Sequence, residues 1–154
     1  MTERARKGSA ERGWETLPDK DLLKIRLHNL RVRIDGTWIE ECLVELYDEL
    51  ARRDIRFRPH AWLSYDWFVP DRIPGIAIPF YLAHPRLMKL ERKQMLEVEG
   101  GTRQELMKIL RHECGHALDN AFDLENEIER QELFGRSAKK YPEHYRPNPA
   151  SRKF

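Results

Sequence analysis

Two histidines and a glutamate in one short stretch have the types and spacing for metal chemistry. His112, Glu113 and His116 form the pattern H-E-x-x-H within LRHECGHALDNAF. On an α-helix, residues four apart lie above one another, so both imidazoles could reach one ion. Imidazole is a common zinc ligand, and Glu113, next to the first ligand, could take a proton from a zinc-activated water. The pattern therefore predicts metal-assisted hydrolysis of an amide bond.

Three other residues of this stretch are expected to support the site. Asp119, three residues after His116 on the same side, would accept a hydrogen bond from an imidazole and fix its orientation. Gly115 would let another backbone approach the helix closely. Cys114 would point away from the imidazoles and pack as a small apolar side chain. The alternative is a solvated histidine pair without a metal, and measuring zinc bound after His116→Ala would distinguish the two.

A catalytic zinc site normally has three protein ligands, and the motif supplies two. The metzincin extension would need glycine at position 119 and histidine at position 122, which hold Asp and Phe instead. The carboxylates from Glu125 onward lie too far along the axis if the helix continues past them. The remaining candidates within the chain are Glu143 and His144, in its proline-rich last part.

Helical spacing surrounds the motif. Apolar residues at intervals of three and four, with capping residues and glycine stops, predict four helices. They are expected over residues 19–34, from Thr37 to Leu50, from Arg86 to the glycine pair at 100–101, and from Thr102 through the motif. Thr37 with Glu40 and Thr102 with Glu105 form two capping boxes, and the second opens the motif's own helix. The motif is therefore expected on a capped, amphipathic helix.

Two segments predict strands. Residues 55–69 and 73–85 are rich in β-branched and aromatic residues, interrupted or bounded by prolines. Pro79 argues for an edge strand, because proline cannot donate to a ladder. The expected fold class is α+β, dominated by helices, with a small antiparallel or mixed sheet.

Length and composition set the remaining expectations. The 154 residues fit one domain, expected over residues 19–154 after a flexible leader, 1–18, whose Trp14 docks locally. A net charge of +2 gives no argument for a nucleic-acid or membrane partner, and neither is expected. Cys42 and Cys114 form no C-x-x-C pair, and no long apolar run occurs. These features predict a cytoplasmic location.

The chain also resembles a bacterial family of zinc-binding metallopeptidases, from about Asp19 to its last residue. The resemblance is carried by GTWIEECLVELYDEL, RFRPHAWLS, PGIAIPFYLAHPRLMKLERKQMLEVEGGTRQELMKILRHECGHALDNAF and YPEHYRPNPASRKF. It implies a zincin-like fold, Zn²⁺ held by His112 and His116, Glu113 as the catalytic base, and a peptide or protein substrate. In zincin-like enzymes an edge strand pairs with the substrate, and GIAIPF is the best candidate for that strand here.

The chain departs from the family in one respect that matters for the metal. Family members continue beyond RPNPASRKF into an EDFAE-like segment, which by analogy with gluzincins would supply a glutamate as the third ligand. Some also carry a zinc ribbon of cysteines at the N-terminus, and this chain has no such cysteines. We therefore expect a domain that is incomplete at its C-terminus, with a metal site that is open, weak or completed by a partner.

Three functions remain as hypotheses. The leading one is a zinc-dependent peptidase. The second is an inactive metal-binding or protein-interaction module that lacks the third ligand. A DNA-associated metalloprotease of the Spartan type shares H-E-x-x-H, but no basic patch or nucleic-acid motif is visible in the sequence. Zinc titration and the loss of hydrolysis in Glu113→Gln would separate the first two.

Overall fold

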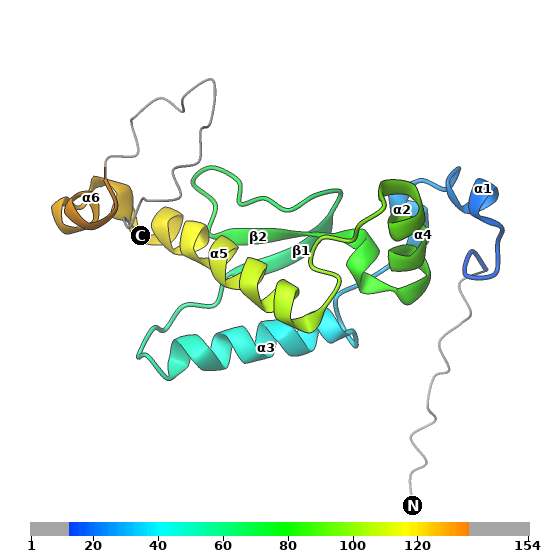
Figure 1. Cartoon of the computed structure of the whole chain (residues 1–154). Coiled ribbons are helices and arrows are strands. Elements are labelled where there is room, and N and C mark those ends of the chain that lie inside the picture. The colour runs from blue at the N-terminus through cyan, green and yellow to red at the C-terminus, as the bar shows by residue number, and fades with distance from the viewer. Residues whose placement is uncertain (1–12, 136–154) are drawn as a thin grey trace, which may run out of the picture.

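The computed structural model describes residues 13–135, which form a helix-rich α+β domain (Figure 1). Its α-helices are α1 Asp19–Leu22, α2 Leu27–Leu30, α3 Trp38–Ala51, α4 Pro85–Met95, α5 Arg103–Phe122 and α6 Ile128–Phe134. Two strands, β1 His60–Ser64 and β2 Gly75–Pro79, and two 3₁₀ turns, η1 Phe80–Ala83 and η2 Leu124–Asn126, complete the order. None of the helices in this part of the chain is both long and apolar enough to cross a membrane.

The two strands pair in parallel, with Trp62 of β1 opposite Ala77 of β2. The expectation of an antiparallel or mixed sheet was not met by this pair of strands. Beside them, Phe68 and Ala77 form an isolated antiparallel bridge. The reason lies in residues 65–74. They pass along the other edge of β2 before the chain enters it, whereas a hairpin would have returned directly beside β1. Parallel strands are usually joined by a dozen residues or more, so this connection is short for its kind.

The core lies between the sheet and two long helices. β2 is buried along its whole length, and α5 packs against it while α3 packs against α5. In Figure 1, α5 crosses in front of the strands and α3 runs below them. Fully buried residues come from all three elements: Ile39, Ile76, Ile78, Leu106 and Leu110. Burying a side chain of this size contributes about 1.5–3 kcal/mol, so this cluster fixes the position of α5.

The predicted helix over residues 19–34 is broken into two short helices, α1 and α2, and Arg31 ends α2 in the left-handed conformation. Trp14 docks as predicted. Its indole N–H donates to the carbonyl of Leu30 at 3.0 Å, and its ring and that of His84 form a T-shaped contact with centroids 5.0 Å apart. The described part of the predicted leader therefore packs on the domain, and residues 1–12 lie outside the description.

The two predicted capping boxes formed to different extents. At the start of α5, the Thr102 hydroxyl accepts from the backbone N–H of Glu105 at 3.3 Å, as expected. At α3, Thr37 makes no capping bond, and Glu40 instead accepts from the backbone N–H of Gly36 at 2.7 Å. Both helices nevertheless begin one residue after the predicted cap.

Candidate metal centre

His112 and His116 lie together on the exposed face of α5. Their Nε2 atoms are 3.2 Å apart, and their rings meet edge to face with centroids 4.9 Å apart. Two nitrogen ligands about 2.05 Å from a tetrahedral zinc ion stand about 3.3 Å apart. The observed separation therefore matches one edge of a zinc coordination tetrahedron, without any change of rotamer.

The opposite face of α5 explains why the imidazoles point outward. Leu106, Leu110, Cys114 and Ala117 recur at intervals of three and four, and all are buried. Burial raises the pKa of the Cys114 thiol to about 11, so the group stays protonated at neutral pH. Cys114 is a packed side chain, as the sequence indicated, and it has neither the exposure nor the thiolate character of a nucleophile.

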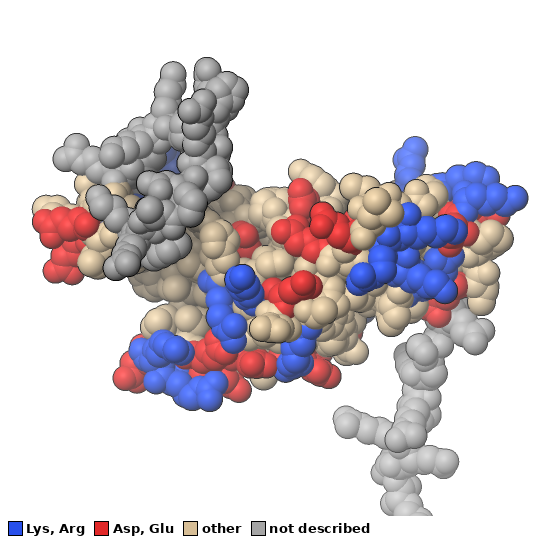
Figure 2. Space-filling view, viewed as in Figure 1, with Lys and Arg blue, Asp and Glu red and all other residues tan. Residues whose placement is uncertain are grey.

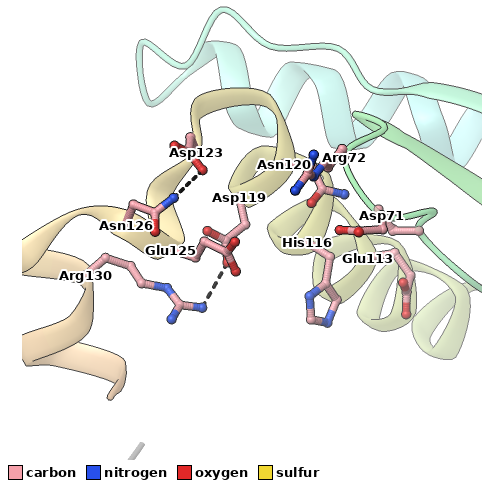
Figure 3. A pocket seen from close by; sticks show the side chains of 11 residues that line it. Asp71, Arg72, Glu113, His116, Asp119, Asn120, Asp123, Glu125, Asn126 and Arg130 are labelled. Atoms are coloured by element: carbon pink, nitrogen blue, oxygen red, sulfur yellow. Dashed lines mark hydrogen bonds and ion pairs between the residues drawn. The ribbon is translucent and has the colours of Figure 1, made fainter. Parts of the chain in front are cut away.

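Glu113 and His116 open onto a cavity of about 1020 Å³ at the C-terminal half of α5. Figure 3 shows its lining side chains, which come from α5, from the loop before β2, and from the turn and helix after α5. The other lining residues are Val69, Asp71, Arg72, Asp119, Asn120, Asp123, Glu125, Asn126 and Arg130. The general base predicted from the motif thus faces a space large enough for part of a peptide.

Asn120 fixes one wall of this cavity. Its side-chain amide donates to the carbonyls of Pro70 and Ile73, at 3.0 and 3.1 Å. The two bonds clamp the loop that carries Asp71 and Arg72 onto α5. The backbone of Arg72 is left-handed, with φ of 59°, a conformation that costs a non-glycine residue energy and that the surrounding contacts must hold. Asn120 was not singled out from the sequence, because nothing local indicates that its partners lie about fifty residues upstream.

Residues that follow the end of α5 form a second wall of the cavity, close to the motif. Asp123 adopts a left-handed conformation, with φ of 52°, and its N–H bonds to the carbonyl of Asp119. The chain reverses there, so Glu125 and Arg130 line the same cavity as His116. The sequence placed Glu125 out of reach on the condition that the helix continues past it, and the helix ends at Phe122 instead. Glu125 therefore lines the cavity, but it does not join His112 and His116 in a group of three possible ligands. Aspartate is among the few non-glycine residues that tolerate this conformation, so an aspartate at position 123 was the signal in the sequence that the helix could end there.

Asp119 does not take the predicted role of orienting an imidazole. Its Oδ2 forms an ion pair with Nη2 of Arg130 at 2.9 Å, which ties α6 to α5. Its Oδ1 is buried and has no hydrogen-bond partner among residues 13–135. A buried acceptor without a donor is energetically costly, so this oxygen is a natural position for a donor from a bound molecule.

The third metal ligand is not found in the described part of the chain. Among residues 13–135, no three His, Cys, Asp or Glu side chains stand close enough together to hold one ion. The two weak candidates from the sequence, Glu143 and His144, lie outside the described residues. The described domain thus presents two imidazoles and an adjacent carboxylate.

Two further expectations about the surroundings of the motif were not met. A Cβ added at Gly115 would meet nothing within 4 Å, so no other backbone approaches the helix there. The N–H and C=O of Ala77, on the outer edge of β2, are both bonded to Phe68, at 2.8 and 3.4 Å. Pro79 has no N–H to offer. The strand lies beside α5 as proposed, but at Ala77 its outer edge is already paired and cannot receive a substrate strand.

Comparison with family models, with curated proteins and with solved structures found no match for this chain. The function must therefore be inferred from the residues of the site.

Proposed function

We propose that the chain is a zinc-dependent metallopeptidase that hydrolyses peptide bonds in peptides or proteins. The observation that carries this proposal is the 3.2 Å separation of the His112 and His116 Nε2 atoms, with His116 and the neighbouring Glu113 lining the cavity. The zincin-like fold and the cytoplasmic location expected from the sequence belong to the same proposal.

Each residue of the motif has a separate task. His112 and His116 would hold the ion through their Nε2 atoms. When bound, zinc lowers the pKa of water and polarises a carbonyl group. Glu113 takes up the proton released by the attacking water and delivers it to the departing amine nitrogen. Its half-buried position at the cavity suits this task, because the carboxylate is accessible to a substrate yet partly shielded from bulk solvent.

The cavity walls would position the substrate. Asp71 and Arg72 place an acceptor and a donor on the wall that faces α5, where they can bind the amide groups of an extended peptide. Asn120 holds this wall through its two bonds to backbone carbonyls. Holding a reacting bond in fixed geometry lowers the entropic part of the barrier, so the rigidity of this loop matters for rate.

The proposal is tested by comparing Glu113→Gln with the matched control Glu105→Gln, which changes an exposed carboxylate in the first turn of the same helix. Purified proteins are incubated with zinc and a mixture of unstructured peptides, and cleavage is followed by mass spectrometry. Glu113→Gln should reduce cleavage by roughly 10²- to 10⁴-fold while bound zinc is retained. Glu105→Gln should cleave like the unchanged chain. Equal cleavage by both variants would contradict the proposal.

A second candidate function is a metal-binding module without peptidase activity. The specific observation that favours it is the lack of a third ligand among residues 13–135. A site of two histidines should bind zinc weakly, whereas three protein ligands should bind it tightly. Weak zinc binding that depends on His116, together with no cleavage of any peptide by the unchanged chain, would favour the module over the enzyme.

A further inference from the structure

Helix α4, at the opposite end of the domain from α6, turns a basic face away from the core. Leu87 and Leu90 are buried on one side of the helix. Arg86, Lys89 and Lys93 follow one another at spacings of three and four, so they share another side. Figure 2 shows lysine and arginine side chains gathered over α4 and the short N-terminal helices. The net charge of +2 for the whole chain conceals this local excess.

A pocket of about 560 Å³ lies in this face. Among residues 13–135, its lining consists of four cations and one carboxylate: Arg86, Lys89, Arg92, Lys93 and Asp19. The formal charge of the lining is +4 − 1, or +3. Glu91, the one carboxylate within α4, is not part of the lining. The residues are also entirely separate from those of the cavity at α5, so what binds here does not depend on the proposed peptidase.

The pocket already holds an anionic group of the protein itself. Asp19 accepts from Nη2 of Arg86 at 2.7 Å and from Nζ of Lys93 at 2.6 Å. The same Arg86 nitrogen donates to the carbonyl of Leu17 at 2.9 Å, which fixes the guanidinium in place. Hydrogen bonds from Lys93 and Arg86 lower the pKa of Asp19, so its carboxylate stays charged. Two of the four cations are therefore engaged.

The other two cations have no such partner. Within residues 13–135, neither Lys89 nor Arg92 makes an ion pair or a side-chain hydrogen bond. Both are exposed, and both line the pocket beside the engaged pair. Their two positive charges suit a phosphate group, which carries close to two negative charges and three free oxygens as a monoester and one negative charge and two free oxygens in a nucleic-acid backbone.

We propose that this pocket binds a phosphate group of a ligand, between Lys89 and Arg92 and next to the resident carboxylate of Asp19. The recognised chemistry is the phosphate itself, whether it belongs to a small phosphorylated molecule or to a nucleic-acid backbone. Asp19 competes with a bound anion for Arg86 and Lys93. Its carboxylate therefore lowers the affinity of the pocket for phosphate, and a change at position 19 should alter that affinity.

The test measures the affinity of the full chain for two probes. Inorganic pyrophosphate is titrated by calorimetry, and a labelled single-stranded oligonucleotide of roughly 20 bases by fluorescence anisotropy, both at low salt because salt screens such contacts. The double variant Lys89→Ala with Arg92→Ala should bind pyrophosphate about tenfold or more weakly. The matched control, Arg52→Ala with Arg53→Ala at the end of α3, removes the same charge elsewhere and should change affinity less than about twofold.

Asp19→Asn provides the opposite change. It keeps the size of the side chain but frees Arg86 and Lys93, and pyrophosphate should bind several-fold more tightly. Pocket-dependent binding of pyrophosphate alone supports a small phosphorylated ligand, and pocket-dependent binding of both probes supports a nucleic-acid backbone. The proposal is overturned if neither probe binds, if both double variants weaken binding equally, or if Asp19→Asn binds more weakly.

Discussion

The two ends of the domain are held by different forces. At the basic end, defined by residues 13–30 and α4, the elements are anchored by buried apolar side chains: Trp14, Leu22, Leu30, Leu87 and Leu90. At the acidic end, defined by η2, α6 and the last turns of α5, α6 has no buried residue. It is tied to α5 by the ion pair between Asp119 and Arg130. The end that carries the H-E-x-x-H motif is thus the one less secured by packing.

The charges of the two ends also differ in sign. Residues 84–96 contain four Lys or Arg and one Glu, a balance of +3, whereas residues 113–134 contain seven Asp or Glu and one Arg, a balance of −6. Figure 2 shows the basic gathering over α4 and acidic side chains on α6 at the far end. Opposite charges at opposite ends partly offset one another in the total, which is why net charge was a poor guide to partners.

The largest expected difference is in the free energy of unfolding that a buried ring contributes at the basic end and an exposed ring at the acidic end. Trp14→Ala removes a buried ring and the bond to Leu30, and it should lower the free energy of unfolding by about 3 kcal/mol or more. Phe134→Ala at the acidic end removes a ring that is 73% exposed. It should change stability by less than about 0.5 kcal/mol. Urea unfolding of the two variants measures the contrast, and similar losses at both ends would show that α6 is packed as firmly as the basic end.

The next effect concerns the polar clamp at the acidic end. Asn120→Ala removes two hydrogen bonds to the loop before β2 and should lower the free energy of unfolding by about 1–2 kcal/mol. The exposed Gln104 on the same helix serves as the control, since Gln104→Ala should leave stability nearly unchanged. If Asn120→Ala unfolds at the same urea concentration as Gln104→Ala, the clamp does not hold the cavity wall.

The smallest expected effect is a loss of stability at acid pH that depends on Asp19. The pKa of Asp19 is lowered below its ordinary value of 3.8 by hydrogen bonds from Lys93 and Arg86. A lowered pKa contributes stability that is complete above the unfolded value and is lost as pH falls through the folded value. The stability difference between the unchanged chain and Asp19→Asn should therefore be constant from pH 7 to about 5 and shrink below about pH 4. Urea midpoints across this range measure it. Asp48→Asn, on the exposed side of α3, is the control.

The helices with long periodic patterns were the part of the fold that could be predicted. α3 and α5 combine apolar residues at helical spacing with recognisable starts, and both begin where the sequence placed them. The spacing of His112 and His116 then fixed their position on one face of α5. The local pattern was sufficient for these helices because the residues that determine where each helix starts and which face is buried lie within a few turns of one another.

Features that depend on distant contacts could not be predicted in this way. The parallel pairing of β1 and β2 depends on the path of residues 65–74, and the end of α5 depends on the left-handed backbone of Asp123. The cavity is completed by Asn120 and Glu125, whose roles follow from these two features. Sequence periodicity describes which face a residue occupies, but it does not say which loop will cover that face.

The most direct test of the account is the zinc content of the chain. Unchanged protein, His116→Ala and the control His28→Ala, which alters an exposed histidine of α2, are equilibrated with zinc at the same free concentration and analysed by mass spectrometry for metal. We expect the unchanged chain and His28→Ala to bind equal amounts of zinc, and His116→Ala to lose this zinc. Equal zinc in all three proteins would contradict the assignment of His112 and His116 as metal ligands.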